Sequence, residues 1–219
     1  MQYNNELLKL PQINEIFERF KKQDPDPKIE LDYCNNYTLL VAVVLSAQST
    51  DKMVNRITPA LFEAANTPEQ MVALGEIGLK EYIKRIGLFN NKARNIIAMS
   101  RMLIDEFNSE VPGDFDSLVK LPGVGVKSAN VVLNTAFDQS RIAVDTHVFR
   151  ISNRIGFCKT KTPEETTNVL SALIPKHWQQ KANHWLVLHG RYVCVARKPK
   201  CKKCIINDIC ISRSKFEDV

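Results

Sequence analysis

The sequence predicts an all-α fold with about ten helices. Between Phe89 and Phe107, apolar residues recur at roughly 3.6-residue spacing, which is typical of one amphipathic helix. Thr67-Pro68-Glu69-Gln70 and Thr162-Pro163-Glu164-Glu165 each combine an N-cap, a first-turn proline and an acid or amide at the third helical position. Strand signals are short and isolated. We therefore expect helices throughout and no sheet.

The most apolar stretch, Leu39 to Ala47, has two possible interpretations. Val41, Val43 and Val44 are β-branched and suit a buried strand. Because no hairpin turn or partner strand follows, we favour a buried helix. The longest wholly apolar run ends at Leu45 and is far shorter than the ~20 residues that a membrane helix needs.

Two breaks divide the chain. Asp24-Pro25-Asp26-Pro27 is the clearest linker, since its prolines lack backbone donors and bias their predecessors away from helix. A second break lies at Asp138-Gln139-Ser140. We expect an inner helical domain of residues 29–139 and a discontinuous domain of residues 1–28 and 140–219. Further helices are expected over Phe115–Lys120, Val126–Phe137 and Thr146–Ile155.

Charge and cysteine usage bound the class of protein. Lys and Arg number 30 against 24 Asp and Glu, a net charge of +6 that favours a polyanionic partner. Residues 1–6 are polar and lack the features of a signal peptide, so we expect a cytoplasmic protein. Six cysteines kept reduced favour metal ligation over disulfides. Cys34 and Cys158 lie apart from the other four, and we expect both to be small buried residues.

The segment from Leu121 to Ser128, LPGVGVKS, connects two of the predicted helices. Gly123 and Gly125 permit a tight turn that leaves the backbone uncovered. The N–H groups that open the second helix would then bind a phosphate oxygen, and such a contact reads the DNA backbone and not its bases. A turn without any ligand is the alternative interpretation of this motif alone.

Lys127 lies in the first turn of that second helix, where the helix dipole disfavours a cation. A nucleophilic lysine must be neutral, and only about one free lysine in 10³ is neutral at pH 7. The positive helix end and partial burial would favour the neutral amine. Placement against local preference is typical of a functional site, although a phosphate-binding lysine is also chemically reasonable.

A carboxylate opens the next predicted helix in Ala143-Val144-Asp145-Thr146-His147-Val148. Asp145 suits the N-cap position. A carboxylate there could also stabilise the cationic sugar that forms as a glycosidic bond breaks. Taken singly, a cap for Asp145 and a structural hydrogen bond for His147 are the simpler interpretations.

Four cysteines near the C-terminus have the spacing C-x6-C-x2-C-x5-C, which indicates a metal site: Cys194, Cys201, Cys204 and Cys210. Four thiolates suit zinc and iron–sulfur clusters alike, and the spacing does not choose between them. The same loop is densely basic, with Arg197, Lys198, Lys200, Lys202 and Lys203. These cations form either a solvated face or, on a loop that a metal holds rigid, a set of phosphate contacts.

Together these motifs resemble the endonuclease III family of DNA glycosylases. LPGVGVKSANVVLNTAF resembles the family's helix–hairpin–helix, AVDTHVFRISNRIG its catalytic aspartate segment, and the four-cysteine loop its [4Fe–4S] cluster. SAQSTD (Ser46–Asp51) and IGLFNNKARNI (Ile86–Ile97) match as well, so the similarity runs from about Asn36 to Cys210. Residues 118–120 are the part of the hairpin region that matches least.

The resemblance implies two helical domains flanking a cleft: a six-helix domain, residues 29–139, and a cluster-bearing domain, residues 1–28 and 140–219. It implies that Lys127 is a Schiff-base nucleophile with Asp145 as its carboxylate partner, and that the metal site holds an iron–sulfur cluster. Gln48 and Leu88 would fill the gap left by a flipped nucleotide. Without the family, a loop amide and a core leucine are the simpler interpretations of these two. Further DNA contacts are expected at Asn91, Gly123, Gly125, His147, Lys198 and Lys202.

The implied function is base-excision repair by a bifunctional glycosylase that removes oxidised pyrimidines and cleaves abasic sites by β-elimination. Its partner would be damaged double-stranded DNA, bound by a nucleoid-associated monomer. One alternative is a monofunctional mismatch-type glycosylase, but relatives of that type generally lack a lysine here and carry an extra C-terminal domain. This sequence has Lys127 and extends only nine residues past Cys210. A non-catalytic iron–sulfur DNA-binding module is the other alternative, and the presence of both Lys127 and Asp145 disfavours it.

Overall fold

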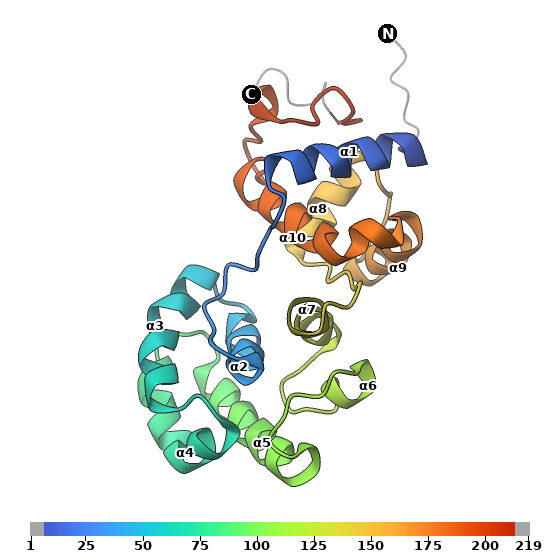
Figure 1. The fold of residues 1–219 in the computed structure, drawn as a ribbon. Helices are drawn as coiled ribbons and strands as arrows, with labels where there is room; N and C mark the ends of the chain where they lie inside the picture. Colours follow the sequence, from blue (N-terminus) through green and yellow to red (C-terminus); the bar gives the residue numbers. More distant parts are fainter. Residues whose placement is uncertain (1–6, 213–219) are drawn as a thin grey trace. The chain divides into compact units, whose positions relative to one another are not determined.

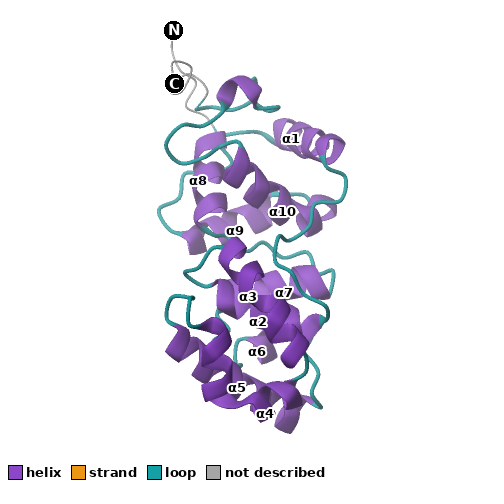
Figure 2. Cartoon of the chain, turned by 90° about the vertical axis from the view of Figure 1, so that its left-hand side faces the viewer, coloured by secondary structure: helices purple, strands orange, loops and turns teal. Residues whose placement is uncertain are grey.

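The computed structural model describes residues 7–212, and all the regular structure in this range is helical (Figure 1; Figure 2). The predicted all-α fold is confirmed. None of the described helices is long and apolar enough to cross a membrane. The helices are α1 (Leu10–Gln23), α2 (Asn36–Ser46), α3 (Asp51–Ala64), α4 (Pro68–Ile83), α5 (Phe89–Phe107), α6 (Phe115–Leu118), α7 (Val126–Ala136), α8 (Thr146–Ile155), α9 (Pro163–Leu173), α10 (Lys176–Tyr192) and the 3₁₀ turn η1 (Cys201–Lys203).

The chain forms two compact units, each with its own apolar core. The inner unit is Ile29–Gln139 and contains α2 to α7. The terminal unit combines Met1–Lys28 with Ser140–Val219 and contains α1 and α8 to α10. The candidate functional residues are divided between the two units.

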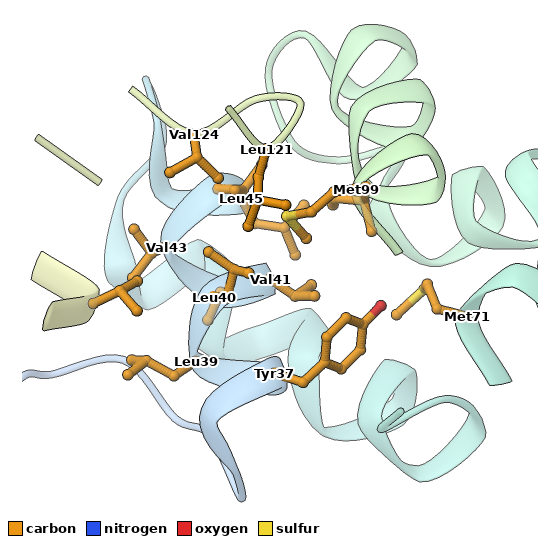
Figure 3. Packing of buried hydrophobic residues seen from close by; sticks show 14 of the residues in the cluster. Tyr37, Leu39, Leu40, Val41, Val43, Leu45, Met71, Met99, Leu121 and Val124 are labelled. Atoms are coloured by element: carbon orange, nitrogen blue, oxygen red, sulfur yellow. The ribbon is translucent and has the colours of Figure 1, made fainter. Parts of the chain in front are cut away.

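The inner unit is built around α2. All its residues from Tyr37 to Leu45 are buried, and it contacts α3, α5 and α7. A helix that is apolar on every side is stable only when other elements surround it. Figure 3 shows α2 side chains packed with Leu121 and Val124, which lie on either side of the turn before α7. The predicted buried helix is thus confirmed and the strand interpretation is wrong.

The predicted helix starts are confirmed by their caps. The Thr67 and Thr162 hydroxyls accept hydrogen bonds from the backbone N–H groups of Gln70 at 3.3 Å and Glu165 at 3.1 Å. One irregularity was not predicted: Gly75, with φ 71°, interrupts the helical backbone within α4. Two predicted helices also end early, α6 two residues before Lys120 and α7 one residue before Phe137.

The terminal unit packs α10 against α8 and α1, and α9 against α8. Phe17 of α1 lies at its centre, stacked on Phe157 with 5.9 Å between ring centroids and in contact with two tryptophans of α10. Arg19 on the same helix donates to both carboxylate oxygens of Asp208, at 2.6 and 2.9 Å, and to the carbonyl of Ile205 at 2.8 Å. Helix α1 therefore holds the end of the four-cysteine loop.

Candidate active site and cluster loop

The turn before α7 in the inner unit has two glycines in different situations. Gly123 has φ 83°, and a Cβ added there would stand 3.0 Å from Cβ of Asn95 on α5. Gly125 is the N-cap of α7 with φ −94°, and a Cβ added there would meet nothing within 4 Å. No side chain caps α7, so its first backbone N–H groups are available to an anion. The backbone at Gly125 is thus uncovered, as the sequence predicts.

Lys127 is the second residue of α7, and its side chain is exposed. It forms no ion pair with any carboxylate in the described range. The expectation of partial burial is wrong, because the buried face of α7 consists of other positions: Ala129, Asn130, Val132, Leu133 and Asn134. Lys127 therefore lies in the first turn of α7, at the positive end of the helix, with its side chain in solvent.

Asp145 opens α8 in the terminal unit. Its Oδ1 accepts hydrogen bonds from the backbone N–H groups of His147 and Val148, both at 2.8 Å, so the cap interpretation is confirmed. The cap engages one carboxylate oxygen and fixes the direction of the other. His147 is half-buried, and its Nδ1 lies 3.3 Å from the Arg150 guanidinium. This contact is consistent with a structural hydrogen bond between His147 and Arg150.

Gln48 and Leu88 share an unusual backbone. Both have positive φ, 54° and 60°, which is uncommon for residues other than glycine and concentrates at functional sites. Leu88 is 55 % exposed, so it is not a core leucine. A Cβ added to Gly87 would stand 3.7 Å from the Gln48 carbonyl oxygen, which places the two turns side by side. Asn91, in the first turn of α5, is also exposed.

Lys92 was not among the site residues predicted from the sequence, and it is only 5 % exposed. Its Nζ donates to the carbonyls of Leu45 at 2.9 Å and Ala47 at 2.5 Å, and to Oγ of Ser49 at 3.3 Å. Burial lowers the pKa of Lys92 below its ordinary value. A signal was present in the sequence, since Lys92 continues the apolar 3.6-residue pattern of α5 and so occupies a position where a core residue is expected.

The four cysteines follow α10 in a single loop of the terminal unit. Burial, and to a lesser extent the charges of the other three cysteines, raises the pKa of Cys204 to about 11. Among residues 7–212, no three His, Cys, Asp or Glu side chains already stand in a metal-binding arrangement. By donor type, four thiols of one loop nevertheless suit a four-cysteine site.

Two arginines join this loop to α8. Arg150 donates to the carbonyls of Gly190 at 2.6 Å and Cys194 at 3.1 Å. Arg154 donates to the carbonyls of Val195 at 2.8 Å and Ala196 at 2.7 Å. The helix that Asp145 opens thus also anchors the first cysteine.

The basic side chains of the cysteine loop face solvent: Arg197, Lys198, Lys200, Lys202 and Lys203 are all exposed.

The two remaining cysteines differ. Cys158 is buried as expected, and burial raises its pKa. The expectation for Cys34 is wrong, since it is exposed. The reason is local: Cys34 lies in the turn before α2, where its backbone N–H bonds to the Thr38 hydroxyl.

Comparison with known proteins places these features in context. Residues 41–176 match the model of the HhH-GPD superfamily base excision DNA repair protein. Endonuclease III of Rickettsia conorii is 57 % identical over 198 residues, covering 90 % of this chain and 94 % of that protein. Endonuclease III of Escherichia coli K12 is 49 % identical over 203 residues, covering 93 % and 96 %.

Solved structures of endonuclease III are also similar to this chain. The chain is similar to endonuclease III in a trapped covalent intermediate with DNA, with a TM-score of 0.89 and 44 % identity over 95 % of this chain and 99 % of that one. It is equally similar to endonuclease III in a non-covalent DNA complex, with a TM-score of 0.89 and 45 % identity over 95 % and 98 %.

Proposed function

This chain belongs to the endonuclease III family of HhH-GPD base-excision repair proteins and is a DNA glycosylase and abasic-site lyase, and we propose that Lys127 is its nucleophile on oxidised pyrimidines in double-stranded DNA. The observation that carries the proposal is the exposed Lys127 at the uncapped start of α7. We further propose that the two compact units are the six-helix domain and the cluster-bearing domain of this family, and that the protein acts as a nucleoid-associated monomer in the cytoplasm.

The proposed chemistry begins with an extruded nucleotide. The neutral amine of Lys127 attacks C1′ of the sugar, and the N-glycosidic bond breaks as the base leaves. Asp145 offsets the positive charge that develops on the sugar. The C1′–O4′ bond of the sugar then breaks, a proton passes from the nitrogen to O4′, and the adduct becomes an imine. The imine acidifies the C2′ protons, and loss of one of them expels the 3′ phosphate by β-elimination.

The remaining site residues hold the DNA. Backbone N–H groups around Gly123 and Gly125 bind a phosphate without reading sequence. Gln48 and Leu88, exposed on adjacent turns, fill the space that the extruded nucleotide leaves. Asn91, His147, Lys198 and Lys202 supply further contacts.

The nucleophile is tested by trapping with borohydride, which reduces the imine to a stable amine. Wild-type protein should form a covalent adduct with abasic and oxidised-pyrimidine duplexes. Lys127→Gln should fold and bind DNA but lose at least about a thousandfold in strand cleavage. Failure of the wild-type protein to form any adduct under conditions where it binds DNA would refute the assignment. A panel of damaged duplexes in the same assay ranks the lesions.

We propose that Cys194, Cys201, Cys204 and Cys210 hold a [4Fe–4S] cluster. Bound there, the cluster would supply rigidity, because the reaction above moves no electrons. On a rigid loop, Lys198 and Lys202 would then contact phosphates at fixed positions. Purified protein should be brown and contain iron with inorganic sulfide. A colourless protein with stoichiometric zinc would overturn this ligation.

A further inference from the structure

The buried Lys92 has no role in the chemistry above, yet all three of its side-chain hydrogen bonds are to one short segment, residues 45–49. An ammonium has three N–H donors, and the acceptors of Lys92 are the carbonyls of Leu45 and Ala47 and the hydroxyl of Ser49. No carboxylate in the described range pairs with it. The whole charge is thus directed at the end of α2 and the turn that follows.

That location suits a cation. The last carbonyls of a helix lack intrahelical donors and carry the negative end of the dipole. At the end of α2, Val43 accepts from the Ser46 hydroxyl, and Ser46 from the backbone N–H of Ser49. Lys92 supplies the donors for two other carbonyls of this segment, those of Leu45 and Ala47. Without Lys92, two carbonyls that it now satisfies would lose their donor.

The segment that Lys92 holds contains Gln48, which has φ 54°. A residue in this region persists only where its surroundings fix it. Lys92 itself is one helical turn beyond Leu88, and its backbone N–H donates to the Leu88 carbonyl at 3.0 Å. One residue therefore contacts both the Gln48 turn (residues 47–49) and the Leu88 turn (residues 87–89).

We propose that Lys92 is a positioning residue that fixes the Gln48 turn beside the Leu88 turn, so that both side chains enter the base stack together. The proposal rests on the proposed gap-filling role of Gln48 and Leu88. Lys92 is too deeply buried to touch DNA, so it acts through the two turns. It should matter where a duplex must be opened and not where the strand is already single.

The test compares Lys92→Met, which keeps the buried apolar stem but removes the donors, with the matched control Lys84→Met on the surface. Single-turnover base excision is measured on an oxidised pyrimidine in a duplex, and β-elimination on an abasic site in a single strand. Lys92→Met should slow the duplex reaction by about tenfold or more and leave the single-strand reaction at the wild-type rate. Lys84→Met should change neither. Equal losses on both substrates, or no loss on the duplex, would overturn the proposal.

A double-mutant cycle separates this proposal from the one beneath it. In a Gln48→Ala/Leu88→Ala background, Lys92→Met should cause no further loss on the duplex, whereas an independent loss contradicts positioning through these turns. If the Gln48→Ala/Leu88→Ala variant itself excises at the wild-type rate, the gap-filling role of these two residues is refuted.

If Lys92→Met does not fold, Ser49→Ala provides the test, because it removes one contact of Lys92. It should lower the ratio of duplex to single-strand rate, and an unchanged ratio would refute the positioning role.

Discussion

At the scale of single residues, Asp145 combines a structural and a proposed chemical role in one side chain. Its Oδ1 caps α8 through two backbone N–H groups. The capping hydrogen bonds need an acceptor oxygen, whereas charge compensation on the sugar needs a carboxylate. The two roles therefore respond differently to substitution.

Asp145→Asn should keep the cap, since asparagine is as good an N-cap as aspartate, while it removes the charge. We expect little change in melting temperature and a loss of about 10²-fold in base excision. Asp145→Ala should lose activity to a similar extent and also about 1 kcal/mol of unfolding free energy. Thermal melts and single-turnover excision on the same preparations measure both effects. An Asn variant with full activity would leave Asp145 with the cap alone.

The positions that sequence patterns predicted well are those governed by local chemistry. Thr67, Thr162 and Asp145 cap their helices as expected because a cap depends on residues within one helical turn. The exposure of Lys127 and the contacts of Lys92 depend on residues far away in the chain. No pattern along the sequence contains that information, although a lysine at an apolar position of α5 was a visible anomaly.

At the scale of elements, residues in the first turns of α5 contact the proposed DNA-contact segments of the inner unit. Leu88 is the N-cap of α5, Lys92 donates to the Gln48 turn, and Asn95 lies against Gly123 of the hairpin. The sequence motifs identified these segments separately. Only the tertiary structure brings these three segments together at one helix.

The hairpin offers a matched pair of substitutions. Gly123→Ala places a Cβ at φ 83° against Asn95 and should cost about 1–3 kcal/mol of unfolding free energy. Gly125→Ala meets nothing within 4 Å and should leave stability nearly unchanged. If a phosphate approaches the backbone at Gly125, the Ala variant should nevertheless bind duplex DNA more weakly. Binding at the wild-type level by a fully stable Gly125→Ala protein would place the phosphate elsewhere.

The cysteine loop makes an electrostatic prediction. Lys198→Ala with Lys202→Ala should reduce the slope of log binding constant against log salt by about 2, equally for all DNA sequences, because each phosphate contact releases counterions. Lys161→Ala with Lys176→Ala is the control, since these lysines are also exposed in the terminal unit but lie outside the loop. Titrations at several salt concentrations measure the slopes. Equal slopes for both pairs would show that the loop lysines are only a solvated face.

At the scale of the whole molecule, the fold was predicted more completely than the site. Helical periodicity and capping residues are repeated along the chain, so the all-α class follows from many independent local signals. The kink at Gly75 was missed because an isolated glycine in a helical pattern is often tolerated. The catalytic assignments needed the shared order of several motifs, since Lys127 and Asp145 each have a simpler interpretation when taken alone.

The stability of the molecule should depend on acidity through His184 of α10. Burial lowers its pKa below 6.5, and the charge of Lys181 adds to the effect. The folded chain therefore resists protonation, so this contribution is fully present above pH 6.5 and is lost as the pH falls below that value. Near neutrality the melting temperatures of wild type and His184→Gln should depend on pH in the same way. Between about pH 6 and pH 5 the melting temperature of the wild type should fall more steeply than that of His184→Gln. Identical pH profiles for the two proteins would exclude His184 as the cause.

In the proposed mechanism one amine, that of Lys127, forms the covalent link to DNA. The most direct measurement is mass spectrometry of the borohydride-trapped complex after digestion of both protein and DNA. We expect a sugar-derived adduct on the peptide that contains Lys127 and no adduct on other lysines. An adduct found on a different residue of the wild-type protein would contradict it.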